Sequence, residues 1–147
     1  MRILVAAALT LGGIGLGTLG LEMSGPAFAE EPYLHDLVKK QPYKNAYASL
    51  MEEMSEPPDY AMDVFKDRGD YLTFPVKPVK VGAWTYRLAA ICPTNVTCAE
   101  YGSVFLFTAD GKRAWGAVRD GDKAEVYLGD PSDAQKQALD NAFDNPD

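Results

Sequence analysis

The stretch SVFLFTADGKRAWGAVRDGDKAEVYL, residues 103–128, contains three apolar segments separated by two turn signals. The pairs Asp110-Gly111 and Asp120-Gly121 are typical of the tight turns between antiparallel strands, because glycine readily adopts the positive φ angles that these turns need. Consecutive strands joined in this way form an antiparallel meander. The predicted strands are 103–108, 113–119 and 124–128.

Two segments upstream extend the predicted sheet. AWTYRLAAI, residues 83–91, alternates so that Trp84, Tyr86 and Leu88 share one face of a strand. TFPVKPVKV, residues 73–81, alternates apolar residues with lysine or proline. Because proline cannot donate a backbone hydrogen bond, this segment is predicted to be an edge strand or an extended connection.

Helical spacing appears before the strands. NAYASLMEEM, residues 45–54, repeats apolar residues on one side, which predicts an amphipathic helix. Pro57 and Pro58 interrupt this pattern, and Pro58 suits the first position of a short second helix over 60–65.

A last helix is predicted after the strands. Ser132 followed by Gln135 has the spacing of a capping box, and the apolar stripe that follows ends before Pro146. The expected fold is α+β: an antiparallel sheet of about five strands with helices packed on one face.

The first 29 residues have the pattern of a signal peptide. Arg2 precedes a glycine-rich apolar run from residue 3 to residue 21, and the small residues AFA at 27–29 suit cleavage after Ala29. A retained membrane anchor is the alternative, although five glycines between Gly12 and Gly20 argue against it. We therefore expect an exported, periplasmic protein whose residues 30–147 form one domain.

The chain is acidic. Its 14 Lys and Arg and 21 Asp and Glu give a net charge of −7, and loss of Arg2 and Glu22 with residues 1–29 leaves this value unchanged. An acidic surface repels nucleic acid and anionic lipid and favours encounter with basic proteins. Solubility of an exported protein is the simpler explanation, so charge alone identifies no partner.

Little in the sequence points to catalysis. The one histidine, His35, lies six residues after the predicted cleavage site, where a packing or surface role is expected. The chain has no CxxC pair, no histidine cluster and no glycine-rich phosphate loop after a strand. We expect neither an enzyme nor a metal or cofactor site.

The two cysteines of the chain, Cys92 and Cys98, enclose five residues directly after the aromatic strand. In an exported protein this spacing indicates a disulfide. Such a small ring mainly fixes the shape of the enclosed PTNVT segment, which would lower the entropy lost on inserting it into a partner. A plain staple at the end of a strand explains the spacing equally well, and both interpretations stay open.

The order of these features resembles the family called inhibitor of vertebrate lysozyme. The resemblance covers nearly all of residues 30–147, including the cysteine-closed loop, FLFTADGKRAWGAV and YLGDPSDAQKQAL. It implies a periplasmic, non-catalytic α+β protein, a lysozyme-inhibitor-like domain whose disulfide-closed loop enters the active-site cleft of c-type lysozyme. In this chain Cys92 and Cys98 match the cysteines of that loop. The matching inhibitory tip is Pro93, Thr94, Asn95, Val96 and Thr97.

The loop departs from the family pattern at its tip. In well-studied members the loop is one residue shorter and carries a histidine and an acidic residue, and the histidine reaches the catalytic carboxylates of lysozyme. Here Asn95 occupies the centre with an uncharged amide, so that charge-assisted bond is lost.

The expected partner is therefore a basic glycan-cleaving enzyme of peptidoglycan, either a c-type lysozyme or a lytic transglycosylase. An envelope binding protein that keeps the fold without inhibiting, or an immunity protein against a lytic toxin, is the alternative. Nucleic acid is not an expected partner, nor is the membrane after signal cleavage. A homodimer is compatible with the sequence.

Overall fold

A computed structural model of the chain describes residues 31–66 and 68–146. The predicted signal peptide lies outside the described residues. Within them, no helix combines the length and the apolar character needed to cross a bilayer. The elements in chain order are α1 (Leu34–Leu37), α2 (Tyr43–Glu52), α3 (Asp59–Asp63), β1 (Tyr71–Thr73), β2 (Lys77–Val81), β3 (Trp84–Pro93), β4 (Tyr101–Phe107), β5 (Ala114–Asp120), β6 (Val126–Leu128) and α4 (Asp133–Asp144).

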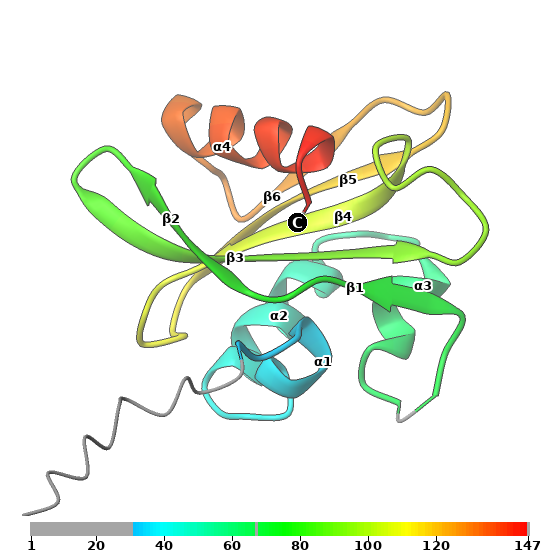
Figure 1. Cartoon of the computed structure of the whole chain (residues 1–147), viewed down its shortest axis with the longest axis horizontal. Coiled ribbons are helices and arrows are strands. Elements are labelled where there is room, and N and C mark those ends of the chain that lie inside the picture. Colours follow the sequence, from blue (N-terminus) through cyan, green and yellow to red (C-terminus); the bar gives the residue numbers. More distant parts are fainter. Residues whose placement is uncertain (1–30, 67, 147) are drawn as a thin grey trace, which may run out of the picture.

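The strands form one antiparallel sheet of six strands, in which β3 to β6 make the predicted meander (Figure 1). The TFPVKPVKV segment supplies β2, while β1 ends at the first residue of the segment, and both strands pair with β3. β1 pairs with the last third of β3, where Leu72 faces Cys92, and β2 pairs with its first half, where Pro78 faces Arg87. The α+β class and the antiparallel sheet are thus confirmed, with six strands where about five were expected.

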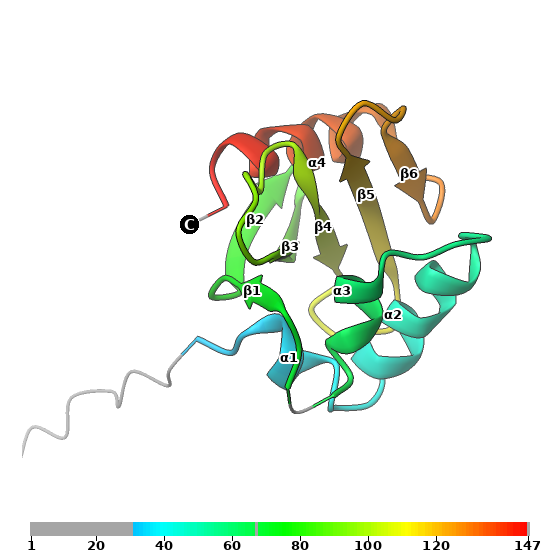
Figure 2. The same ribbon diagram turned by 90° about the vertical axis from the view of Figure 1, so that its right-hand side faces the viewer.

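Helices cover both faces of the sheet, which corrects the expectation of helices on one face. α1, α2 and α3 lie below the sheet in Figure 1, whereas α4 lies above it, and Figure 2 shows the same separation from the side. Neighbouring residues of β3 alternate between the two layers: Ala89 and Ile91 belong to the core under α1 to α3, and Leu88 and Ala90 to the core under α4. The physical reason is that β3 and β4 are apolar on both sides, and each side must be covered.

Tyr47 of α2 organises the larger core. Its ring is fully buried and packs edge-on against Phe105 of β4, with 5.0 Å between ring centroids. Its hydroxyl donates a hydrogen bond of 2.7 Å to the carbonyl of Ala61 in α3. One side chain therefore links two helices to the centre of the sheet and satisfies its own buried polar atom.

The smaller core lies under α4, which begins as predicted. The Ser132 side chain accepts from the backbone N–H of Gln135, and the Gln135 side chain accepts from the backbone N–H of Ser132, so the capping box is complete. Leu139 and Phe143 then turn toward the sheet and are buried.

Two details of the other helices differ from expectation. α3 begins at Asp59 with Pro58 as its N-cap, where Pro58 was expected at the first helical position. The short helix α1 was not predicted, because its four residues are too few to show a helical repeat.

Candidate functional site

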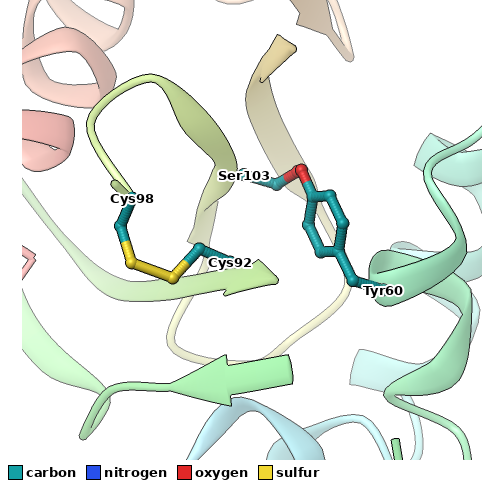
Figure 3. Close-up of a disulfide and its surroundings, with 4 residues drawn as sticks. All are labelled: Tyr60, Cys92, Cys98 and Ser103. Atoms are coloured by element: carbon teal, nitrogen blue, oxygen red, sulfur yellow. A yellow bond between two sulfur atoms is a disulfide. The ribbon is translucent and has the colours of Figure 1, made fainter. Parts of the chain in front are cut away.

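The candidate site is the disulfide loop, residues 92–98, which connects the end of β3 to the start of β4. Cys92 is 1 % exposed and belongs to the strand, and its disulfide to Cys98 spans 5.3 Å between Cα atoms (Figure 3). The predicted disulfide is therefore present in the structure. It closes the loop at the ends of β3 and β4, two inner strands of the sheet.

Backbone hydrogen bonds hold both arms of the disulfide loop. On the first arm, β1 pairs as far as Tyr71 opposite Pro93, and the Thr94 N–H then donates to the carbonyl of Asp70 at 3.2 Å. On the second arm, the carbonyl of Thr97 accepts from the N–H groups of Glu100 and Tyr101, both at 2.9 Å. The disulfide joins these two arms just below the tip.

The tip itself points to solvent. Asn95, Val96 and Thr97 are exposed, whereas Pro93 and Thr94 are half-buried at the base. Asn95 has a φ of 66°, a left-handed conformation that asparagine tolerates better than most residues. The predicted tip residues thus form one contiguous structure, with the Asn95 amide at its exposed centre.

Gly102 allows the second arm to fold back onto the strand. A Cβ atom at this position would lie 2.7 Å from the carbonyl oxygen of Cys98 and 3.3 Å from that of Ile91. Both neighbours are backbone atoms, so a side chain here would push the arm away from β3.

A side-chain pair from another element supports the loop base. The hydroxyl groups of Tyr60 in α3 and Ser103 in β4 lie 2.9 Å apart, beside the disulfide in Figure 3. Ser103 is 1 % exposed, so this bond satisfies a buried hydroxyl. Burial raises the pKa of Tyr60 to about 12, so its hydroxyl stays protonated into the alkaline range where a free tyrosine ionises.

Arg119 of β5 fixes the segment that follows Cys98. Its guanidinium donates to the carbonyl of Ala99 at 3.2 Å, pairs with Glu125 and lies 4.0 Å from the centroid of the Phe143 ring. The arm is therefore tied to β5 and, through Phe143, to α4. Arg119 and Ala99 are 20 residues apart in the chain, so no local sequence pattern indicates this contact.

The surroundings of the loop base are rich in carboxylates. Asp70 and Glu100 flank the two arms, and Asp120 lies opposite Tyr101 in the sheet register. Lys123 is paired with Asp120 at 2.5 Å. The tip itself is uncharged, and the base of the loop carries Asp70 and Glu100 next to its two arms.

The arrangement suits binding by shape and hydrogen bonding. The tip sequence PTNVT offers one amide and the hydroxyls of Thr94 and Thr97, and none of these groups can become cationic. The structure brings the five predicted tip residues together. Sequence reasoning missed four supporting residues: Tyr60 and Arg119 come from distant elements, whereas Gly102 and Ser103 follow the loop at the start of β4.

His35 lies at the start of the described chain in a packed environment. Its Nδ1 atom is 3.2 Å from the Thr73 hydroxyl, its Nε2 atom is 3.4 Å from an Asp36 oxygen, and its ring stacks on Tyr33. Over residues 31–66 and 68–146, no three His, Cys, Asp or Glu side chains are grouped so that they could hold a metal ion.

Comparison with known proteins gives no match: no protein-family model, no curated protein and no solved structure is significantly similar to this chain.

Proposed function

We propose that the mature protein is a periplasmic inhibitor of a peptidoglycan-cleaving muramidase, and that the disulfide loop enters the active-site cleft of that enzyme. The target is a c-type lysozyme or a lytic transglycosylase. The observation that carries the proposal is the construction of the loop: the tip is exposed and polar, the first arm is hydrogen-bonded to the segment before β1, and the second arm is held by a local turn at the start of β4.

Rigidity of the arms favours binding in a cleft. Ordering a free loop costs about 1 kcal/mol or more for each backbone residue that becomes fixed. In this protein the pairing at Pro93 and the bonds to Asp70 and Thr97 fix the arms before any partner is met. The arms are therefore already ordered in the folded protein, and little further conformational entropy is lost when the loop binds a partner.

The chemistry of the tip suits a site that contains carboxylates. Glycan-cleaving enzymes of this kind work with one or two carboxyl groups in a long groove. The Asn95 amide has two N–H donors for such groups, and the PTNVT tip has no carboxylate of its own that would repel them.

Charge supports a basic partner. Asp70 and Glu100 lie next to the two arms at the base of the loop and would face the rim of the bound cleft. Complementary charge at a rim raises the rate of association more than the strength of the final complex. The same loop would serve an immunity protein against a lytic toxin, since the chemistry of the target cleft is shared.

The test is a titration of residues 30–147 against c-type lysozymes and lytic transglycosylases, with clearing of a cell-wall suspension as the readout. Asn95→Gly removes the amide and keeps a residue that accepts the left-handed backbone. If the amide reaches a catalytic carboxylate, this variant should inhibit about 10- to 150-fold more weakly, from ~1.5 to 3 kcal/mol for a hydrogen bond to a charged group. Asn95→His should strengthen inhibition of c-type lysozyme, because neighbouring carboxylates favour the cationic imidazole.

Asn45→Ala is the matched control, because it removes another exposed amide, in the first turn of α2. It should inhibit like the wild type. If every enzyme clears the cell-wall suspension at its uninhibited rate, the protein is not a muramidase inhibitor. Full inhibition by folded Asn95→Gly would show that the tip amide does not contact the catalytic groups.

A further inference from the structure

A groove of about 1120 Å³ lies at the end of the sheet opposite the disulfide loop. It is bordered by the start of β3, by the turn between β4 and β5, and by the segment that leads into α4. Trp84 and Cys92 are eight residues apart on β3, which corresponds to about 26 Å in an extended strand. Figure 1 shows the start and the end of β3 at opposite ends of the sheet, so the groove is separate from the proposed inhibitory loop. Its lining includes Trp84, Tyr86, Arg113, Trp115, Asp130 and Gln135.

Both tryptophans of the chain line this groove, in very different environments. Trp115 is 6 % exposed and forms a fixed floor, because Tyr86 packs edge-on against it at 5.6 Å and the Arg113 guanidinium lies 4.8 Å from its ring centroid. Trp84 is 72 % exposed, the largest fraction among the exposed large apolar residues of the described chain. Tryptophan is usually well buried, so an open indole beside a groove indicates a surface that a ligand covers.

The polar groups around the indole rings carry balanced charge. Asp110 and Asp130 on the rim are matched by Lys112 and Arg113. Gln135 adds an amide, and its Nε2 atom lies 3.4 Å from the Tyr86 hydroxyl. A groove without net charge gives no preference to an anion or a cation, whereas it offers many donors and acceptors to an uncharged polar ligand.

We propose that this groove binds an uncharged oligosaccharide strand, with one sugar ring stacked on Trp84. The carbon-bound hydrogens of a pyranose form a flat apolar face that fits an exposed indole, while the ring hydroxyls need planar hydrogen-bonding partners at the sides. Asp130 and Arg113 are side chains of that kind. A purely apolar peptide would leave these polar groups unpaired, at about 1–3 kcal/mol for each buried one.

The binding site and the disulfide loop can act at the same time, because they lie at opposite ends of the molecule. A protein that holds a glycan strand at one end and presents a loop at the other would be retained on the polymer that its target attacks. This consequence rests on the proposed function, whereas oligosaccharide binding itself does not.

The test uses tryptophan fluorescence, which reports on the groove alone because both indoles of the chain line it. Residues 30–147 are titrated, without any enzyme, with a soluble N-acetylglucosamine oligomer and with a glucose oligomer of equal length. A saturable change in emission with at least one of them is expected, and calorimetry should give the same Kd. Trp84→Ala should weaken binding about tenfold or more, while Trp84→Phe should retain part of the affinity.

Leu72→Ala is the matched control, since Leu72 is 49 % exposed on β1 at the other end of β3. It should bind like the wild type. The proposal is overturned if neither oligomer binds, if Trp84→Ala binds as tightly as the wild type, or if only a proline-rich peptide changes the emission. It is also overturned if sedimentation shows a dimer that Trp84→Ala dissociates, because Trp84 would then be a subunit contact. Muramidase inhibition by Trp84→Ala should be unchanged on a small soluble substrate, which separates this test from that of the loop.

Discussion

Opening the disulfide between Cys92 and Cys98 should destabilise the fold and loosen the loop by separately measurable amounts. The two cysteines are six positions apart, so the closed ring contains seven residues. In the chain-entropy model, a ring of seven residues removes about 7.9 cal/mol/K from the unfolded chain. The free energy of unfolding should therefore fall by about 2.4 kcal/mol at 25 °C when the bond is opened.

Opening the disulfide should weaken binding to the target enzyme only through the tip of the loop. The bonds from Thr94 to Asp70 and from Glu100 and Tyr101 to Thr97 do not depend on the disulfide, so the arms should stay in place. Asn95 and Val96 would gain freedom. Refixing two residues on binding costs about 2 kcal/mol, which predicts an inhibition constant about 30-fold weaker.

Stability is measured by urea unfolding of the wild-type domain in its oxidised and reduced forms, since reduction removes no side-chain atoms. A midpoint lower by roughly 1 to 2 M urea is expected. A reducing agent also acts on disulfides of a target enzyme, so inhibition is measured with the variant Cys92→Ala/Cys98→Ala.

Either measurement can refute the reasoning. An unchanged midpoint would show that the ring does not restrict the unfolded chain. A double variant that is folded and inhibits as well as the wild type would show that the disulfide does not pre-order the tip, and the bond would then be a staple of the strand end only.

Three further outcomes follow from the loop base. Tyr60→Phe should lower the free energy of unfolding by about 1–3 kcal/mol, because it leaves the buried Ser103 hydroxyl without its partner, whereas Ser103→Ala should lower it less; equal losses in chemical denaturation would contradict this. Because burial raises the pKa of Tyr60 to about 12, the folded state keeps a proton that the unfolded chain releases from about pH 10. The free energy of unfolding should therefore fall by ~2 to 3 kcal/mol between about pH 10 and 12, and it should fall less steeply in Tyr60→Phe. If the wild type and Tyr60→Phe lose stability in parallel over this range, Tyr60 does not carry the raised pKa. Gly102→Ala would place a Cβ atom 2.7 Å from the Cys98 carbonyl oxygen and should cost about 1–3 kcal/mol; a thermal melt identical to wild type would mean that the arm moves freely.

Much of the fold could be predicted because its signals are local. The Asp-Gly turns, the alternation in β3 and the capping box at Ser132 each involve residues within a few positions of one another. The cysteine spacing likewise identified the loop before its surroundings were known. Helix α2 was expected at 45–54 and lies at Tyr43–Glu52, a difference within the usual uncertainty of helix ends.

The placement of helices was predicted less well than their existence. The continuous apolar runs LAAI in β3 and VFLF in β4 are typical of strands buried on both faces, and this signal argued against helices on one face alone. A periodic pattern shows that a helix has an apolar side, but it does not show which face of a sheet that side meets.

The sequence by itself determined the α+β pattern, the antiparallel meander and a five-residue polar tip between two cysteines, and export remains a prediction from it. Only the tertiary structure decided what stabilises that tip and what lies at the other end of the sheet. Tyr60 contacts Ser103 and Arg119 contacts Ala99, while Trp84 lines one groove together with the segment that leads into α4. Such contacts join residues far apart in the chain, and their geometry is set by the packing of the whole domain, so no local pattern encodes them.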